Sequence, residues 1–266
     1  MWKQKEFGSS KHMVDLQKIS GLPIFLDEEK MNLEFNGDFQ FIKKSERSLE
    51  ELKPYLMSLR DISRREKNHH VDEDLDPVYY VWRYAHLKKD SEKIKEANLR
   101  YDLTLIPPGK IDSEFAKTAG HYHKKYPEIY EVLIGRAYFL IQSESAVYLA
   151  EVGPGEKFLV PPSFGHNTIN VFNKPLLLAN WISEKAIYDY KPYEENRGAM
   201  YYFIADGKMV DIIKNSNYGF TPEIKKILPK EYPEFGIFKN QPLYSLVDNL
   251  EKLKFLNYPE KLKLEI

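Results

Sequence analysis

The 266-residue sequence contains no cysteine, no long apolar run and no excess of charge of either sign. The absence of cysteine excludes disulfides and thiolate chemistry, so a bound metal has to be held by histidine, aspartate or glutamate. No apolar stretch approaches the length of a membrane span, and the opening MWKQKEFGSSKHMVDLQ lacks the apolar centre of a secretory signal. The 39 basic and 40 acidic residues leave no broad field for nucleic acid. We therefore expect a soluble cytoplasmic protein with no membrane and no nucleic-acid partner.

What the sequence does contain is a series of short segments rich in aromatic and β-branched residues. Its 19 tyrosines and 15 phenylalanines favour strands over helices. Glycine, proline, asparagine or serine separates the segments, and no helical segments alternate with them. This pattern predicts a β-sandwich or small barrel and disfavours a parallel sheet with crossover helices. The predicted strands are 78–86, 100–106, 128–134, 136–142, 146–152, 157–162, 166–172, 176–182, 201–206 and 209–214.

The segments before these strands predict smaller elements. LEFNGDFQFI, residues 33–42, has the pattern of a hairpin with Asn36-Gly37 as its turn. Residues 48–59 predict a short helix after a serine cap, which Pro54 disturbs. Residues 60–77 are strongly charged and are expected to form a loop or a short helix.

The last fifty residues differ from the strand-rich region. Thr221-Pro222-Glu223 is a typical helix start, and residues 244–256 place apolar side chains at helical spacing. We expect a helical tail that packs on the barrel or on a partner chain. The predicted organisation is an N-terminal extension (1–45) that packs on the barrel, the barrel itself (46–217) and the tail (218–266).

Three histidines and one glutamate form a candidate metal site. His121 and His123 are two apart on extended chain, so they face the same side, and Glu128 begins the next predicted strand. A second cluster, GEKFLVPPSFGHNTIN, ends a strand with two prolines and then presents His166. A histidine pair alone is more often surface or core than ligand. Three imidazoles with one carboxylate, however, are a workable ligand set for iron, manganese, nickel or zinc and leave a position open for substrate.

The order of these residues resembles the two motifs of the cupin superfamily. H-x-H is followed by a glutamate and a glycine, and a later glycine and proline precede His166 with an asparagine four residues beyond it. The resemblance is close over residues 115–170 and implies an antiparallel β-barrel of the jelly-roll type. Two loop positions depart from the pattern, because Phe115 and Ser163 replace glycines.

Among cupins, the chain resembles the cupin-type glucose-6-phosphate isomerases of archaea from about residue 50 to about residue 215. The segments that carry the resemblance are TLIPPGK, TAGHYH, EIYEVLIG, VPPSFGHNTIN and IYDY. It implies one divalent metal per chain, with Fe²⁺ expected and Mn²⁺, Ni²⁺ or Zn²⁺ as alternatives, and a homodimer is our expectation for a barrel of this type. The implied metal ligands are His121, His123, Glu128 and His166.

The same resemblance implies a sugar-phosphate pocket. Its phosphate end would use Thr104, Thr118 and Gly120, and Tyr130 and Tyr190 match pocket tyrosines of the family. Two pocket positions depart from the family: Tyr188 replaces a histidine, and Trp181 corresponds to a tyrosine. Tyr188 is therefore expected to contact substrate, and both departures are expected in the pocket wall.

The implied reaction is the interconversion of glucose 6-phosphate and fructose 6-phosphate. A metal would polarise the sugar oxygens, and Glu128 would carry the proton between C1 and C2, with Tyr130 or Tyr190 donating hydrogen bonds. A metal-supported hydride shift is the alternative route. Two other functions stay open: a different cupin enzyme, such as an iron dioxygenase or another sugar-phosphate isomerase or epimerase, and a non-catalytic sugar-binding module.

Several of these residues also have an ordinary structural explanation. Thr104 and Thr118 could be plain strand threonines, Tyr130 a core residue, and Tyr190 part of an aromatic seal at the barrel mouth. Other polar residues are expected to have structural or surface roles rather than roles in the site. These are Lys124 and Lys125 on a solvated face, His69 and His70 at the surface, His86 as a satisfied structural histidine, and Glu131 facing away from Glu128.

Overall fold

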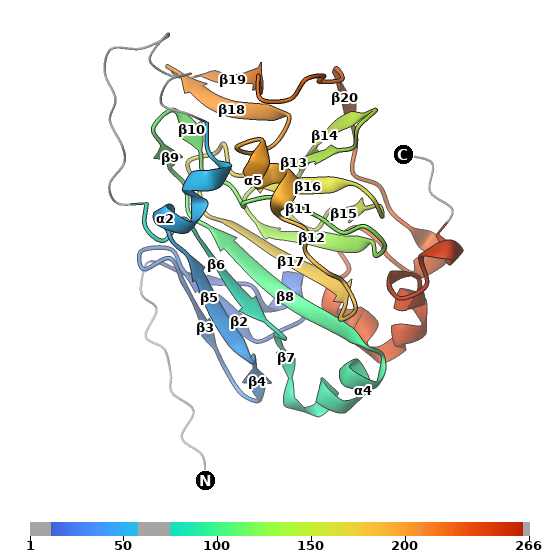
Figure 1. Ribbon diagram of the computed structural model, residues 1–266. Helices are drawn as coiled ribbons and strands as arrows, with labels where there is room; N and C mark the ends of the chain where they lie inside the picture. The colour runs from blue at the N-terminus through green and yellow to red at the C-terminus, as the bar shows by residue number, and fades with distance from the viewer. Residues whose placement is uncertain (1–11, 58–74, 208, 263–266) are drawn as a thin grey trace.

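Two mainly antiparallel sheets face each other at the centre of the computed structural model, which describes residues 12–57, 75–207 and 209–262 (Figure 1). The larger sheet has six strands, in the order β15 (Lys157–Val160), β12 (Glu128–Ile134), β17 (Leu176–Ser183), β8 (Leu99–Ile106), β6 (Tyr79–Arg83) and β5 (Lys43–Arg47). The second sheet has five strands, in the order β11 (His121–Tyr122), β16 (Gly165–Ile169), β13 (Ala137–Gln142), β14 (Val147–Val152) and β20 (Ile224–Ile227). These strands confirm the prediction of a mainly β fold.

Three smaller sheets complete the strands of the described chain. They contain β19 (Met209–Lys214), β18 (Tyr201–Asp206), β10 (Glu114–Phe115) and β9 (Lys110–Ile111) in one; β1 (Met13–Asp15), β2 (Ile24–Asp27) and β3 (Asn32–Phe35) in another; and β4 (Phe39–Gln40) with β7 (His86–Leu87). Hydrogen bonding keeps these sheets separate within the described residues, so the two main sheets pack as facing layers and do not close into one continuous barrel.

Both faces of the six-stranded sheet are buried. Successive side chains of a strand point to opposite faces. Val132 and Leu178 therefore lie in the core between the two main sheets, while Leu133 and Leu177 join a second core on the outer face. This explains why β17 reads as a nearly continuous apolar run, LLLANWIS.

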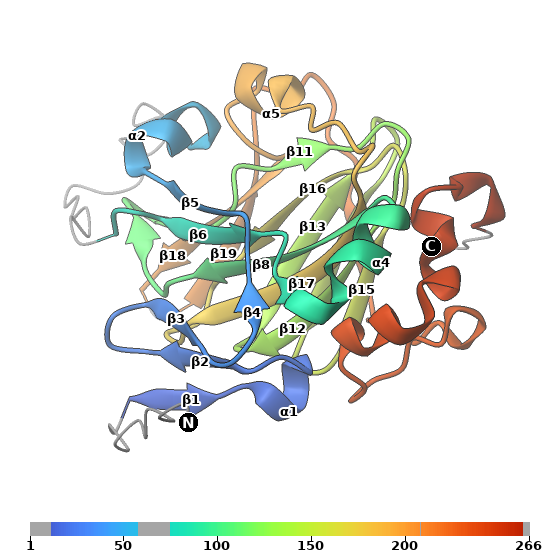
Figure 2. The same cartoon turned by 90° about the horizontal axis from the view of Figure 1, so that it is seen from below.

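The N-terminal segment covers part of that outer face (Figure 2). Leu22, Ile24 and Leu26 are fully buried there. The predicted hairpin over 33–42 is wrong, because β3 pairs with β2 while β4 pairs with β7. The turn between β3 and β4 lies at Gly37-Asp38 instead of Asn36-Gly37, and of Asn36 and Gly37 only Gly37 has the positive φ that a type I′ hairpin requires at both positions.

The helices of the described chain are short. The predicted helix after Ser48 is present as α2, which has a full capping box between Ser48 and Glu51, and Pro54 lies in the 3₁₀ turn that follows. Most of the charged segment 60–77 lies outside the described residues. The helices are α1 (Gln17–Ser20), α2 (Leu49–Leu52), α4 (Ser91–Glu96) and α5 (Lys191–Glu195), with 3₁₀ turns η1 (Lys53–Tyr55), η2 (Lys88–Asp90), η3 (Pro233–Phe235), η4 (Leu243–Leu256) and η5 (Pro259–Lys261). No helix among the described residues is both long and apolar enough to cross a membrane.

The tail differs from its prediction in two respects. The expected helix at Thr221-Pro222-Glu223 is wrong, because the residues that follow form β20, which pairs in parallel with β14. Only six residues separate Pro222 from Pro229, too few for a stable helix, and the free edge of β14 supplies backbone partners instead. Over the second helical stretch the chain forms 3₁₀ turns with a break at Asn249, where φ is −149° and ψ is 68°.

The tail packs on the outer face of the six-stranded sheet, beside the N-terminal segment (Figure 2). Leu253, Phe255 and Leu256 are buried in the outer core, so the apolar stripe of the tail contacts its own chain. Trp181 of β17 stacks on Tyr244, with ring centroids 6.1 Å apart, and its indole N–H donates to the Leu243 carbonyl. The division of the chain at residues 45 and 217 stays a prediction.

Candidate metal centre and substrate cavity

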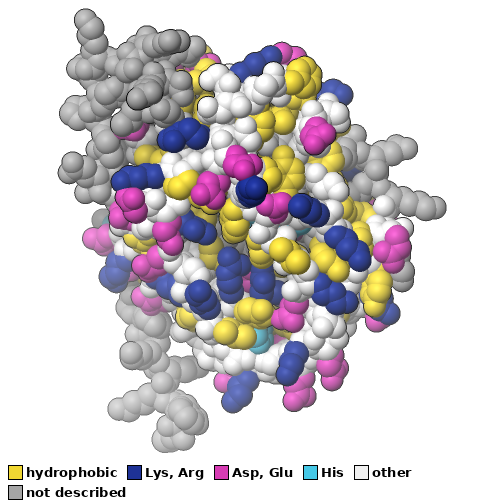
Figure 3. Space-filling view, viewed as in Figure 1, with side chains coloured by type: hydrophobic (Ala, Val, Ile, Leu, Met, Phe, Trp, Pro, Cys, Tyr) yellow, Lys and Arg dark blue, Asp and Glu magenta, His cyan; other side chains and the backbone are white. Residues whose placement is uncertain are grey.

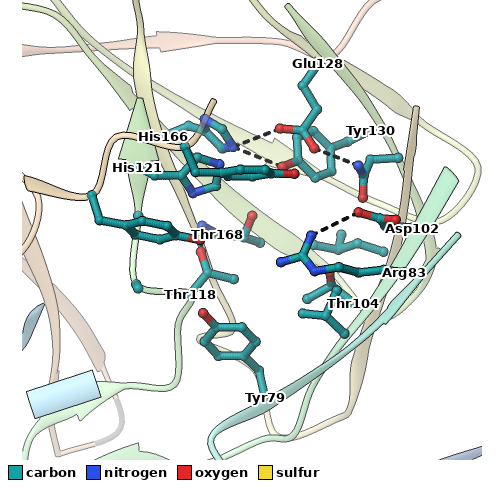
Figure 4. Close-up of a pocket in the computed structure, with 17 residues that line it drawn as sticks. Tyr79, Arg83, Asp102, Thr104, Thr118, His121, Glu128, Tyr130, His166 and Thr168 are labelled. Carbon is teal, nitrogen blue, oxygen red and sulfur yellow. Dashed lines mark hydrogen bonds and ion pairs between the residues drawn. The ribbon is translucent and has the colours of Figure 1, made fainter. Parts of the chain in front are cut away.

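The four predicted metal ligands lie together between the two main sheets, and Figure 4 shows three of them, His121, Glu128 and His166. His121 on β11 is the direct cross-strand partner of His166 on β16, and Glu128 is the first residue of β12. His123 Nε2 lies 2.9 Å from His121 Nε2 and 3.1 Å from Glu128 Oε2, and His166 Nε2 lies 3.4 Å from the same oxygen. One ligand atom from each side chain thus falls within 4.8 Å of the others.

Burial and mutual contact set the charges in this cluster. Burial lowers the pKa of His121 well below its usual value, and the neighbouring imidazoles lower it further. Burial also lowers the pKa of His166, although the charge of Glu128 opposes it. For Glu128, burial acts to raise the pKa, but His123 and His166 outweigh it and hold the pKa well below the usual range. Near pH 7 the neutral imidazoles of His121 and His166 therefore lie beside an ionised carboxylate, the protonation states that metal coordination requires.

These residues fit a divalent cation. Imidazole nitrogens with one carboxylate oxygen suit iron, manganese, nickel or zinc. The Nδ1 atoms of His123 and His166 are buried and have no hydrogen-bond partner among the described residues. The polar contacts of both rings are therefore made by Nε2, on the side where the four ligand atoms converge.

The cluster opens onto a cavity that contains the predicted substrate residues. Thr118 Oγ1 accepts a hydrogen bond from the Thr168 backbone N–H, which fixes its position on the wall. Tyr130 places its hydroxyl 2.9 Å from His166 Nε2. Burial raises the pKa of Tyr190 to about 12, so this tyrosine stays protonated near pH 7. The predicted residues that line the cavity are Thr104, Thr118, Gly120, His121, Glu128, Tyr130, His166, Tyr188 and Tyr190. His123 lies behind them, against Glu128.

The structure adds polar residues that the sequence analysis missed. Asn180 of β17 donates from Nδ2 to Glu128 Oε1 at 2.6 Å and so fixes the carboxylate. Arg83 of β6 and Asp102 of β8 also line the cavity, 3.2 Å apart between Nη1 and Oδ2. Two signals were present: Asn180 interrupts an apolar run, and Arg100, Asp102 and Thr104 alternate along one strand.

The two departures from the family pattern have different outcomes. Tyr188 lies at the cavity, with its ring centroid 4.7 Å from those of His121 and His123, and its hydroxyl accepts a hydrogen bond from Arg100 Nη2. Trp181 does not lie in the cavity wall, so that prediction is wrong. The preceding residue of β17, Asn180, faces the cavity. Because side chains alternate along a strand, Trp181 points to the outer face, where the tail covers it.

The residues with expected structural roles mostly have them. His86 is satisfied, because its Nδ1 lies 2.7 Å from the Tyr84 carbonyl and its Nε2 2.9 Å from Ser91 Oγ. Lys124 is largely exposed and pairs with Asp189. Glu131 points to the outer face, away from Glu128, where it pairs with Lys157. His69 and His70 lie outside the described residues. Acidic and basic side chains interleave over the face shown in Figure 3, as the balanced composition leads one to expect.

Gly120 offers a test of the cavity wall. Its φ of +81° favours glycine, and a Cβ there would overlap the ring of Tyr193. We expect Gly120→Ala to lose about 1–2 kcal/mol of stability through backbone strain and about 1–3 kcal/mol more through displacement of the ring. Gly37→Ala is the matched control, since Gly37 also has positive φ but open space around it. Unfolding in denaturant measures both variants, and equal losses would rule out the clash with Tyr193.

Comparison with known proteins decides the family. A family model described as "Glucose-6-phosphate isomerase (GPI)" matches residues 58–219, well over half of the chain. The glucose-6-phosphate isomerase of Thermococcus litoralis is 32% identical over 177 residues, which are 65% of this chain and 87% of the relative. The chain belongs to the glucose-6-phosphate isomerase family. The enzyme of Pyrococcus furiosus with the same name is 29% identical over 185 residues, 68% of this chain and 92% of the relative.

The family assignment confirms the resemblance to the glucose-6-phosphate isomerases, and it ends at residue 219, before β20 and the tail. Solved structures align over smaller parts of the chain. An oxalate oxidase in complex with glycolate covers 36% of this chain and 47% of its own, with a TM-score of 0.31 and 19% identity. A Lactobacillus farciminis oxalate decarboxylase covers 46% of this chain and 32% of its own, with a TM-score of 0.34 and 20% identity. The assignment to the glucose-6-phosphate isomerase family therefore depends on sequence.

Proposed function

We propose that this protein is a metal-dependent aldose–ketose isomerase that interconverts glucose 6-phosphate and fructose 6-phosphate. The observation that carries the proposal is the convergence of ligand atoms from His121, His123, Glu128 and His166, within 4.8 Å of one another, in a chain of this family. A divalent metal bound by these four residues would polarise the carbonyl and hydroxyl oxygens of the sugar as a Lewis acid. We propose one such ion per chain, Fe²⁺ before Mn²⁺, Ni²⁺ or Zn²⁺. The homodimer and the cytoplasmic location stay predictions.

In this proposal different side chains of the cavity carry out proton transfer, hydrogen bonding and phosphate binding. Glu128, ionised and fixed by Asn180, takes the proton from one carbon and returns it to the other. Tyr130 and Tyr190 stay protonated, because burial raises the pKa of each, and can donate hydrogen bonds to sugar oxygens. Thr104, Thr118 and Gly120 form the wall proposed for the phosphate. Binding the phosphate away from the reacting carbons would position C1 and C2.

Metal dependence is tested by following fructose 6-phosphate turnover in a coupled assay for glucose 6-phosphate. We expect chelated protein to be inactive and activity to return with Fe²⁺, Mn²⁺, Ni²⁺ or Zn²⁺, each added separately. The thermal midpoint should also rise when metal is added, because a ligand that binds only the folded chain stabilises it. Folded, metal-loaded protein without turnover would reject the isomerase and favour another cupin chemistry or a sugar-binding module.

A further inference from the structure

The cavity has a cationic cluster between its two ends. Antiparallel pairing places Arg83, Asp102, Asn180 and Tyr130 in one row across β6, β8, β17 and β12. Two residues along the strands, on the same face of the sheet, the next row in one direction contains Thr104. The next row in the other direction contains Glu128. Arg83 is therefore placed between the metal cluster and the threonine wall, with its guanidinium pointing into the cavity (Figure 4).

Arg83 keeps donors free for a ligand. Asp102 is almost fully buried, and its two oxygens share a bifurcated hydrogen bond from Arg100 Nε–H, at 3.0 and 2.8 Å, while Oδ1 also accepts from the Tyr84 backbone N–H. Within the described residues Arg83 donates a single hydrogen bond, from Nη1 to that carboxylate, although a guanidinium has five N–H donors. Two arginines share one carboxylate, so the cluster carries one excess positive charge.

The excess charge matches the one charged group of a sugar phosphate. Among the described residues that line the cavity, Arg83 is the only lysine or arginine. Tyr79 also lines this cavity. Its hydroxyl accepts a hydrogen bond from Arg47 Nε at 3.2 Å, which leaves the hydroxyl proton free to donate to a ligand. Sugar hydroxyls are neutral and need no cation, whereas a phosphate dianion gains most from a guanidinium in a partly dry site.

We propose that Arg83 is the residue that makes this cavity selective for phosphorylated sugars, by binding the phosphate dianion beside Thr104, Thr118 and the Tyr79 hydroxyl. The inference rests on the proposed function and adds to it a charge that hydroxyls and backbone N–H groups do not supply. Asp102 is a positioning residue, because its carboxylate accepts a hydrogen bond from Arg83 Nη1 and so orients the guanidinium. Arg100 is a positioning residue as well, because it holds that carboxylate.

The test is calorimetric binding of glucitol 6-phosphate, which has no carbonyl to react, and of glucitol, to metal-loaded protein. We expect the wild type to prefer the phosphorylated compound, and inorganic phosphate to compete with it. Arg83→Gln should weaken glucitol 6-phosphate binding about 10- to 100-fold, the effect of losing a charge-assisted hydrogen bond. Arg83→Lys should bind between the two, because it keeps the charge and loses the fork.

Arg136→Gln is the matched control, because Arg136 is exposed and pairs with Glu151 on the surface. Arg83→Gln should fold, since Asp102 keeps its ion pair and bifurcated hydrogen bond with Arg100, and the thermal midpoint and metal content of the variant check this. Unchanged affinity in Arg83→Gln, or no preference for the phosphorylated compound in the wild type, would overturn the inference. If the wild type turns over fructose 6-phosphate but Arg83→Gln binds glucitol 6-phosphate with unchanged affinity, the role of Arg83 is rejected and the isomerase function stands. Lost affinity in a protein without turnover would keep the phosphate site and reject the isomerase.

Discussion

Glu128→Gln is expected to lower kcat for fructose 6-phosphate by about a thousandfold, within the range that a positioned general base contributes. The carboxylate is buried, ionised and fixed by Asn180, and it lies 3.1 Å from His123 Nε2 and 3.4 Å from His166 Nε2. Glutamine preserves the shape and an oxygen ligand but cannot accept the proton. KM should change much less than kcat, because the substituted group acts on the reacting carbons and not on the phosphate.

The same variant separates loss of chemistry from loss of metal. Metal content is measured alongside turnover, and Glu151→Gln, an exposed position of β14, is the control that should match the wild type. Isomerisation in D₂O then distinguishes the two routes. Deuterium at C2 of the glucose 6-phosphate product supports proton transfer through Glu128, whereas its absence favours a hydride shift. Full turnover in a metal-loaded Glu128→Gln variant would contradict any proton role for this residue.

The cluster of His121, His123, Glu128 and His166 was predictable because its motif spacing is visible in the sequence. His121 and His123 lie two apart on extended chain, and His121 then pairs across the sheet with His166. Thr104, Thr118 and Gly120, which we propose for the phosphate, were also expected at the cavity, and all three line it. The roles of these residues in substrate binding and catalysis are proposals.

The rest of the site depends on register, which the sequence expresses only weakly. A shift of one residue moves every side chain of a strand to the opposite face. Correspondence to a family tyrosine placed Trp181 in the wall, whereas the register of β17 turns it to the outer face and brings Asn180, which was overlooked, to Glu128. Arg83 was missed for a different reason: its role follows from pairing with Asp102 on β8, and pairing between distant segments is not visible in either segment alone.

Local signals also failed where tertiary pairing was stronger. Asn36-Gly37 is a strong hairpin signal, yet the two flanking segments pair with β2 and β7. Thr221-Pro222-Glu223 is a strong helix start, yet the next residues form a strand that pairs with the edge of β14. The pairing of β4 with β7 and of β20 with β14 joins segments that are distant in sequence, so short-range propensity could not predict it.

The largest stability effect is expected at a buried ion pair under the tail. Lys157 and Glu131 are cross-strand partners on β15 and β12, with Nζ and Oε1 2.8 Å apart and both side chains almost fully buried. Glu131 Oε2 accepts from the Leu243 backbone N–H at 2.7 Å, and Lys157 Nζ donates to the Gln241 carbonyl at 2.5 Å. The pair thus joins the strand that begins with Glu128 to the tail that the family match does not cover.

Lys157→Met should lose about 3–5 kcal/mol, because it leaves a carboxylate buried without its cation. Thermal and denaturant unfolding measure the loss, which corresponds to a fall of roughly 10 °C in midpoint for a chain of this size. Lys239→Met is the control, since its pair with Glu156 is half exposed and should contribute less than about 1 kcal/mol. The double variant Lys157→Met/Glu131→Gln should recover most of the stability, because glutamine is neutral and can still accept from Leu243.

The loss should also depend on pH in a defined direction. Burial raises the pKa of Glu131 from its usual 4.5 to about 7, with Lys157 acting against the rise. Without Lys157 the folded pKa moves higher still. A carboxyl whose pKa is raised by folding stabilises the folded chain at low pH, and that contribution is lost as pH rises through the folded pKa. The deficit of Lys157→Met relative to the wild type should therefore be larger at pH 8 than at pH 5. An equal deficit at both pH values would show that Glu131 does not carry the cost, and that the tail is held mainly by its apolar contacts with Trp181 and the outer core.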